Sequence, residues 1–212
     1  MKKAANVLVS IVASALVLTA VSCSKKEAAA PAAAPAEAAP AAAESQAAAP
    51  AAAEIPAAAL KNINGAYISA NDLTVGALTT SFKDEASGFT LNATEEKAMA
   101  VEQPQEPAVL GNEVFAQRVS TKGSGNTTLR NITFTAKKDD SIIIYCAQGG
   151  SSNRPLHVAA VADGSEVAEL SMDPKGSQMN VFEVTAPADG DYCVYSTTGG
   201  CYIYQIKVGK AN

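Results

Sequence analysis

Apolar and polar residues in the C-terminal part of the chain alternate with the period of β-strands. Within residues 129–136, Ile132, Phe134 and Ala136 are apolar, whereas the residues between them are polar. Such alternation describes a strand with one face on a core and the other in water. Residues 141–146 form an almost continuous apolar run, which predicts a central strand covered on both faces. Residues 137–140 are predicted to form the turn of a hairpin that joins these two strands.

Further short strands are predicted along the same part of the chain. Turn residues such as Asp163-Gly164 and Gly199-Gly200 separate most of the apolar runs, and no stretch has a sustained period of 3.6 residues. The additional strands are predicted at residues 66–69, 88–91, 98–101, 114–120, 156–161, 166–170, 178–185, 192–196 and 202–208. This pattern predicts an all-β, antiparallel jelly-roll β-sandwich with little helix.

The first 22 residues have the layout of a signal peptide. Lys2 and Lys3 precede an apolar run at 7–18, and small residues then lead to Cys23. As a helix, a run of about 12 residues would be about 18 Å long, which is short for a hydrocarbon layer of about 30 Å. We therefore expect residues 1–22 to be a signal peptide and not a permanent transmembrane helix.

The residues before Cys23 resemble a bacterial lipoprotein signal. In such signals the cysteine sulfur receives a diacylglycerol and the cysteine becomes the mature N-terminus. The third position before Cys23 is Ala20 instead of the usual Leu, a relaxed pattern similar to that of spirochaetes. The resemblance implies lipidation at Cys23 and a cell-envelope protein held to a membrane, most simply the outer membrane. The alternative is plain secretion, with Cys23 an incidental thiol.

Residues 23–59 are expected to be a tether. Residues 28–59 contain 21 Ala, 5 Pro and 3 Glu in 32 positions, with Ile55 as the one branched aliphatic residue. This segment has too little apolar surface to offset the entropy of ordering, and its prolines divide it into pieces too short for stable helices. The tether would space the domain from the lipid surface, or it is filler without a selected length. Residues 60–212 then form a single domain.

Charge in residues 60–212 argues against nucleic-acid binding. The segment has 12 Lys and Arg against 17 Asp and Glu, a balance of −5. A phosphate backbone requires a strongly basic surface, which this balance does not provide.

The sequence gives no support for a metal centre, a cofactor or an enzyme. His157 is the single histidine, and no Cys-x-x-Cys pair occurs, so His157 is expected to be a packing or surface residue. The acidic pairs Asp139-Asp140, Asp189 with Asp191 and Glu95-Glu96 lie at predicted turns, where Asp often bonds the backbone. Surface solvation or a structural Ca²⁺ would also account for the turn aspartates. No nucleophile elbow or phosphate-binding glycine loop is present.

Three cysteines lie in the predicted domain, at Cys146, Cys193 and Cys201. If residues 197–200 form a hairpin loop, Cys193 and Cys201 are out of register and cannot pair. Cys146 could bond either of them, or all three could be reduced core residues.

Several strand and turn sequences together resemble a known β-sandwich module. They are residues 115–118, 123–125, 130–134, 142–145, 151–156, 188–196 and 202–208. This series is similar to the galactose-binding-like, carbohydrate-binding-module domains appended to secreted pectate-lyase-type proteins. The resemblance implies a jelly-roll sandwich with a binding role, and the catalytic β-helix that accompanies such modules is absent from this chain.

Sugar binding requires aromatic faces together with polar donors. If the final predicted hairpin lies beside the loop at 149–154, one cluster satisfies both needs, namely Asn153, Arg154, Tyr195, Ser196 and Tyr202. The tyrosines would otherwise pack the sandwich and Arg154 would lock the fold. We therefore expect a non-catalytic module that binds glycan or envelope polysaccharide, or alternatively an adhesive surface lipoprotein that binds a protein partner; a polysaccharide-degrading enzyme is the weakest alternative.

Overall fold

The computed structural model describes residues 55–172 and 178–212, and the signal peptide, Cys23 and most of the tether lie outside this range. Two short 3-10 helices occur in the described residues, η1 (Ala57–Leu60) and η2 (Ala70–Asp72). The strands are β1 (Ile63–Ser69), β2 (Gly76–Leu78), β3 (Phe82–Lys83), β4 (Thr90–Asn92), β5 (Met99–Glu102), β6 (Ala108–Leu110), β7 (Glu113–Phe115), β8 (Arg118–Ser120), β9 (Asn131–Ala136), β10 (Ser141–Gln148), β11 (Leu156–Ala160), β12 (Glu166–Leu170), β13 (Asn180–Thr185), β14 (Gly190–Tyr195) and β15 (Cys201–Ala211). None of the helices in this part of the chain is long and apolar enough to cross a membrane.

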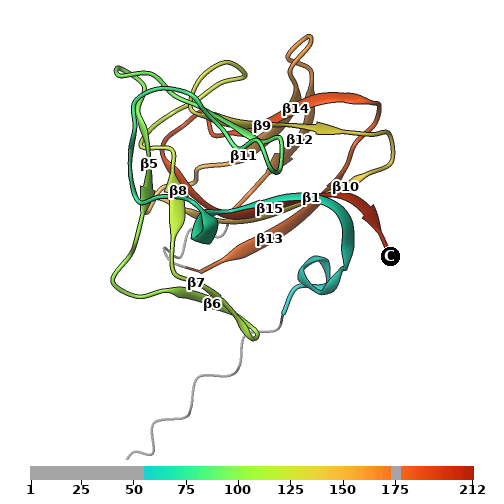
Figure 1. The fold of residues 1–212 in the computed structure, drawn as a ribbon, viewed down its shortest axis with the longest axis horizontal. Helices are drawn as coiled ribbons and strands as arrows, with labels where there is room; N and C mark the ends of the chain where they lie inside the picture. The colour runs from blue at the N-terminus through green and yellow to red at the C-terminus, as the bar shows by residue number, and fades with distance from the viewer. Residues whose placement is uncertain (1–54, 173–177) are drawn as a thin grey trace, which may run out of the picture. The chain divides into compact units, whose positions relative to one another are not determined.

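All strands but β6 and β7, which pair with each other, form two antiparallel sheets packed face to face (Figure 1). The first sheet has the order β13-β10-β15-β8-β5-β2, and β1 pairs with the C-terminal half of β15. The second sheet, above the first in Figure 1, has the order β12-β11-β14-β9-β4-β3. The all-β, antiparallel jelly-roll sandwich predicted from the sequence is confirmed.

The main core lies between the two sheets because alternate residues of each strand point inward. In β10, Ile142, Ile144 and Cys146 join this core, with no exposed surface. The opposite face of β10 is also covered, since Ile143 and Tyr145 belong to a second buried cluster. The expectation that the apolar run is a central strand covered on both faces is therefore confirmed.

The second cluster lies on the outer face of the first sheet, beneath the separate β6–β7 hairpin. The Phe115 ring of β7 packs against the rings of Tyr145 and Tyr204, with centroids 5.7 Å and 5.8 Å away. Ala59 of η1 also packs there, and its carbonyl oxygen accepts a hydrogen bond from the Tyr145 hydroxyl at 3.4 Å. The last residues of the predicted tether thus contact the sandwich.

The hairpin predicted for residues 129–136 and 141–146 is wrong, because β9 lies in the second sheet and β10 in the first, so the two strands do not pair. Several strand boundaries also differ from those predicted. The strand predicted at 114–120 is two strands, β7 and β8, because the chain leaves one ladder and joins another between them. At this break the Gln117 backbone N–H donates to the Asn71 side-chain oxygen at 3.0 Å instead of to a strand. The predicted pattern also lacked β2, β3 and β6, which have only two or three residues each and are too short to show alternation.

Candidate functional site: two grooves beside strand β1

A groove runs between strand β1 and the turn that follows β3. It has a volume of about 420 Å³, and Ile68 and Leu73 contribute apolar surface to its lining. Asp72, Phe82 and Asp84 also line it. We call this hollow the first groove. Its position follows from the topology, because within residues 55–172 and 178–212 β1 pairs only with β15 and β3 only with β4, which leaves the sandwich open between them.

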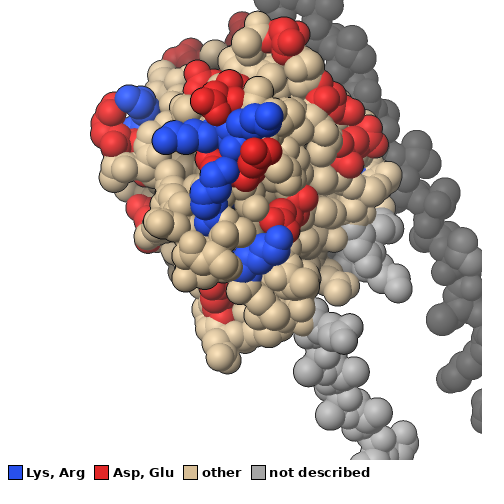
Figure 2. All heavy atoms as spheres, turned by 90° about the vertical axis from the view of Figure 1, so that its right-hand side faces the viewer, with Lys and Arg blue, Asp and Glu red and all other residues tan. Residues whose placement is uncertain are grey.

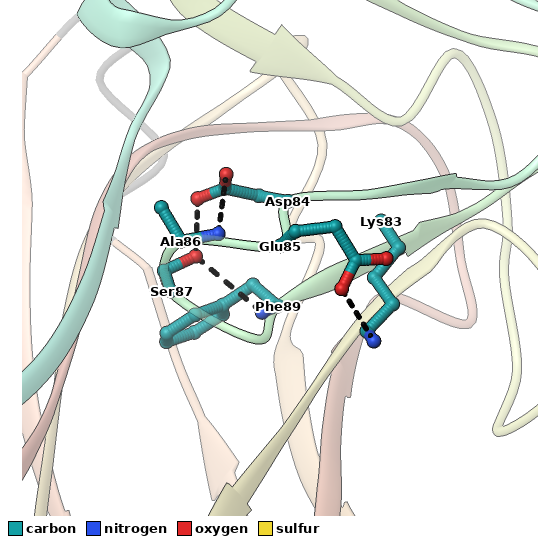
Figure 3. A network of polar contacts seen from close by, with 6 residues as sticks. All are labelled: Lys83, Asp84, Glu85, Ala86, Ser87 and Phe89. Atoms are coloured by element: carbon teal, nitrogen blue, oxygen red, sulfur yellow. Dashed lines mark hydrogen bonds and ion pairs between the residues drawn. The ribbon is translucent and has the colours of Figure 1, made fainter.

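The turn at Lys83–Phe89 holds the Asp84 carboxylate in a fixed place (Figure 3). The Ser87 hydroxyl and the Ala86 backbone N–H both donate to this carboxylate. The Ser87 hydrogen bond lowers the pKa of Asp84 below its usual value, since it favours the ionised form. The turn is closed by two backbone hydrogen bonds of 2.8 Å between Asp84 and the residues Gly88 and Phe89. Asp84 therefore presents an ordered negative acceptor to the first groove.

A second groove, with a volume of about 390 Å³, lies on the outer side of β1. Lys61, Asn62, Gln205 and Lys207 give it a polar lining. The Gln205 side-chain oxygen is buried, and no donor from the described residues reaches it.

Tyr67 borders both grooves and is the most exposed aromatic residue among those described, with 54% of its surface accessible. Phe82, in the first groove, is 41% exposed. Aromatic rings of this kind offer apolar faces to the C–H surface of a sugar ring, and the neighbouring carboxylates and amides bond its hydroxyls. The two grooves thus combine the two kinds of contact that sugar recognition requires.

Surface charge on another face is mixed. Figure 2 shows that Lys and Arg side chains on the right-hand side of Figure 1 are interspersed with Asp and Glu side chains. Ion pairs in the described residues include Lys61–Glu183 at 2.6 Å and Lys210–Asp140 at 3.4 Å. This face therefore does not present an uninterrupted basic surface.

Arg154 lies across two glycine-rich loops. Its Nη1 donates to the Gly200 carbonyl oxygen at 2.8 Å. A β-carbon at Gly150 would lie 2.4 Å from Arg154 Nη2, and one at Gly199 would lie 2.9 Å from its Nε. The neighbouring Asn153 is exposed. The expected proximity of the 149–154 loop to the loop before β15 is therefore present, with the guanidinium packed between the loops.

The predicted final hairpin is wrong, because β14 and β15 lie in different sheets, and the predicted tyrosines are separated with them. Tyr195 of β14 is buried on the outer face of the second sheet, where its ring stacks on the His157 ring with centroids 5.4 Å apart. Tyr202 of β15 belongs to the outer face of the first sheet, and the Arg118 guanidinium carbon lies 3.5 Å from its ring centroid. Ser196 is fully buried, and its hydroxyl has no partner in the described residues. The structure brings Arg154 to the loop before Tyr202 but places Tyr195 in the other sheet, and ligand binding by the five residues stays a prediction.

The turn aspartates make backbone or hydroxyl contacts. Asp189 accepts from the Lys138 backbone N–H at 2.6 Å, and Asp140 accepts from that of Lys137 at 2.9 Å. Asp191 accepts from the Thr135 hydroxyl at 2.6 Å. These contacts account for the choice of Asp at the turns without an ion.

The three cysteines of the described residues are free. Cys146 and Cys201 belong to the main core, whereas Cys193 lies on the outer face of the second sheet. Cys193 and Cys146 therefore lie in different layers. Of the two disulfides that the sequence left open, only Cys146–Cys201 would join residues of the same cluster. Burial raises the pKa of Cys146 well above its usual value, and it raises those of Cys193 and Cys201 to about 11.

The sequence pattern did not predict the two grooves beside β1. Tyr67 lies in a strand predicted to begin only at residue 66, and the alternation from Ile63 through Gly65 to Tyr67 is weakened by the small residues at 65 and 66. Tyr67, an aromatic residue at an outward position of the edge strand β1, was the one feature of the sequence that indicated a binding surface here. The pairing of β1 with β15, which creates both grooves, is a long-range contact that local patterns do not encode.

Comparison with known proteins gives partial structural likenesses. Neither a protein-family model nor a curated protein matches the sequence. Among solved structures, the chain is similar to the CBM36-1 domain of a multidomain xylanase from the hindgut metagenome of Trinervitermes trinervoides, with 11% identity, a TM-score of 0.38, and coverage of 70% of this chain and 99% of that chain. It is also similar to a family 35 carbohydrate binding module from Clostridium thermocellum, with 15% identity, a TM-score of 0.33, and coverage of 52% and 90%. For the C-terminal CBM6 of LamC from Zobellia galactanivorans the identity is 16%, the TM-score 0.33, and the coverage 69% and 100%. At these TM-scores the likenesses carry no inference about function.

Proposed function

We propose that the protein is a lipid-anchored lipoprotein of the cell envelope whose sandwich binds a glycan or envelope polysaccharide and catalyses no reaction. The observation that carries the binding role is the exposed ring of Tyr67, which borders both grooves. A glycan chain lying along β1 would place a sugar face on this ring. Its hydroxyls would then reach Asp84 in the first groove and the polar lining of the second.

The test is binding of the full chain, purified in detergent, to a glycan array and to immobilised envelope polysaccharides. Tyr67→Ala is expected to weaken binding about tenfold, since an aromatic stacking contact is worth about 1 kcal/mol or more. Asp84→Asn should weaken it as well, because the amide loses the charge that strengthens the hydrogen bond. Val109→Ala is the matched control, as Val109 is 60% exposed on β6, outside both grooves.

A second possible location of the glycan site is the predicted cluster of Asn153, Arg154, Tyr195, Ser196 and Tyr202. Tyr202→Ala tests this location in the same assay. Loss of binding in Tyr202→Ala with full binding in Tyr67→Ala would transfer the site to that cluster. A blank array would contradict glycan binding at either place.

Adhesion to a protein partner is the second candidate function. The observation that favours it is the edge of β1 that no strand of the described residues pairs with, which lies beside the exposed side chains of Tyr67 and Phe82. An added strand could pair with such an edge. Chemical crosslinking at Tyr67 on intact cells, combined with a blank glycan array, would favour this function.

The membrane anchor is tested separately, because Cys23 lies outside the described residues. Metabolic labelling with an alkyne fatty acid is expected to mark the wild-type chain and not the Cys23→Ser variant. Unchanged labelling of the variant would contradict lipidation at this residue. Proteolysis of intact cells then distinguishes an exposed outer-membrane position from one beneath the envelope surface.

A further inference from the structure

The outer face of the second sheet carries three side chains whose ligand atoms are suited to a metal ion. They are His157 of β11 with Glu166 and Glu169 of β12, and one ligand atom from each lies within 4.8 Å of those of the other two. His157 Nδ1 lies 2.6 Å from a carboxylate oxygen of Glu166. Among the described residues, no other group of three His, Cys, Asp or Glu side chains comes together in this way.

A β-bulge places the two carboxylates on the same face. Glu166 and Glu169 are three residues apart, so in a regular strand they would point to opposite faces. In this hairpin Glu169 pairs with His157, whereas Ala159 pairs with Glu166, and Val167 is the extra residue of the bulge. Bulges are frequent beside functional sites because they re-aim a side chain. Here the bulge turns Glu166 toward His157 and Glu169.

The imidazole is held rigidly behind the carboxylates. The His157 side chain is 9% exposed, and its ring stacks on that of Tyr195 at an interplanar angle of 21°. Its Nε2 lies 3.1 Å from the Thr197 hydroxyl oxygen. When Nε2 carries the hydrogen and donates to Thr197, the Nδ1 lone pair faces Glu166 and Glu169. Metal-binding histidines are held in this way, with one nitrogen on the ion and the other bonded to a second group.

Charge balance also favours a cation between these side chains. Two carboxylates converge on one imidazole, and a divalent ion between them would balance their negative charge. The Glu166 side chain is 49% exposed and Glu169 is exposed, so both can move the short distance needed for bonds of about 2.0–2.2 Å to a metal. A ligand set of one imidazole and two carboxylates suits Zn²⁺ better than Ca²⁺, which prefers six or more oxygens.

We propose that His157, Glu166 and Glu169 bind a Zn²⁺ ion on the outer face of the second sheet, with water completing its coordination. The ion joins the edge strand β12 to β11 and stabilises the folded chain by mass action. This site belongs to the β11–β12 hairpin and shares no residue with the grooves beside β1. The zinc proposal can therefore be tested independently of glycan binding.

The test is calorimetric titration of the full chain, purified in detergent, with ZnCl₂. One ion per chain is expected to bind, with loss of binding in His157→Asn and at least about tenfold weaker binding in Glu169→Gln. Thr197→Val should weaken binding about 10- to 100-fold, as expected for a group that orients a ligand. Glu96→Gln is the matched control, since Glu96 is exposed and lies outside the site; its affinity should equal that of the wild type.

Thermal unfolding in EDTA shows whether each variant folds. Glu169 is exposed, so Glu169→Gln provides the test if His157→Asn does not fold. The absence of binding at Zn²⁺ concentrations on the order of 100 µM would overturn the proposal. Unchanged affinity in the folded Glu169→Gln variant would also overturn it. Replacement by Co²⁺ provides a further readout, because a sulfur-to-cobalt charge-transfer band would assign the ion to a thiol and reject this site.

Discussion

Gly65 and Gly209 lie opposite each other in the ladder that joins β1 to β15. A β-carbon on Gly65 would lie 2.0 Å from the Val208 carbonyl oxygen and 2.8 Å from the Gly209 Cα. Both atoms belong to the backbone, so neither can move without disturbing the ladder. The close approach of the two glycines thus sets the position of β1, and with it the two grooves.

Gly65→Ala is therefore expected to displace β1 and to destabilise the fold by about 1–3 kcal/mol, the usual cost of overpacking. Urea unfolding followed by circular dichroism measures the change. Gly190→Ala is the matched control, because a β-carbon at Gly190 meets nothing within 4 Å. Equal unfolding midpoints for the two variants would contradict this account of the β1–β15 contact.

Glu183 provides a pH-dependent contribution to stability. Its carboxylate lies 2.6 Å from Lys61 Nζ and accepts from the Ser141 hydroxyl at 2.8 Å. The hydrogen bond from Lys61 is the main cause that lowers the pKa of Glu183 below its ordinary value of 4.5, with burial opposing it. A depressed folded-state pKa means that the contribution is present above about pH 4.5 and is lost as pH falls through the folded-state value.

Glu183→Gln is expected to flatten the loss of stability between pH 7 and pH 3. The difference should be below about 1 kcal/mol, since the Lys61 side chain is 42% exposed and the pair is screened by solvent. Urea midpoints at both pH values measure it, with Glu96→Gln as an exposed control that keeps the wild-type pH dependence. An identical pH profile in wild type and Glu183→Gln would show that the pair contributes nothing.

Alternation along the sequence predicted the sandwich because the inward residues of the long strands face one core. The central position of β10 could be predicted from its apolar run alone, since a strand covered on both faces is apolar at almost every position. The grooves could not be read in this way, because Tyr67 and Asp84 are distant in sequence and meet through pairing of β1 and β3 with other strands. His157 and Glu166 illustrate the same limit, since the bulge at Val167 depends on the register of β11 with β12.

The three buried cysteines are expected to resist thiol reagents. Burial raises the pKa of Cys193 and Cys201 to about 11 and that of Cys146 well above its usual value, so few thiolates exist at pH 8. The native chain should show no rapid reaction of these thiols with Ellman's reagent, and all three should react after unfolding in urea. One rapidly reacting thiol in the native chain, retained when the three are replaced by Ala, would identify an unmodified Cys23 and argue against the lipid anchor.

Arg154 provides a last test, which separates a structural role from a binding role. Its guanidinium bonds the Gly200 carbonyl oxygen and covers the backbone at Gly150 and Gly199. Arg154→Ala is expected to lower the free energy of unfolding by about 1–2 kcal/mol, through the lost hydrogen bond and the uncovered loops. Asn153→Ala, at the exposed neighbouring position, should change it by less than about 0.5 kcal/mol.

Urea unfolding and glycan binding of both variants, measured side by side, distinguish the two roles. A stability loss in Arg154→Ala, with glycan affinity unchanged, would make Arg154 a residue that joins the two loops. Unchanged stability with weakened glycan binding would instead place Arg154 in the binding site and restore the predicted cluster. The contacts with Gly200 favour the first result, because a guanidinium held by the loops has fewer donors left for a sugar hydroxyl.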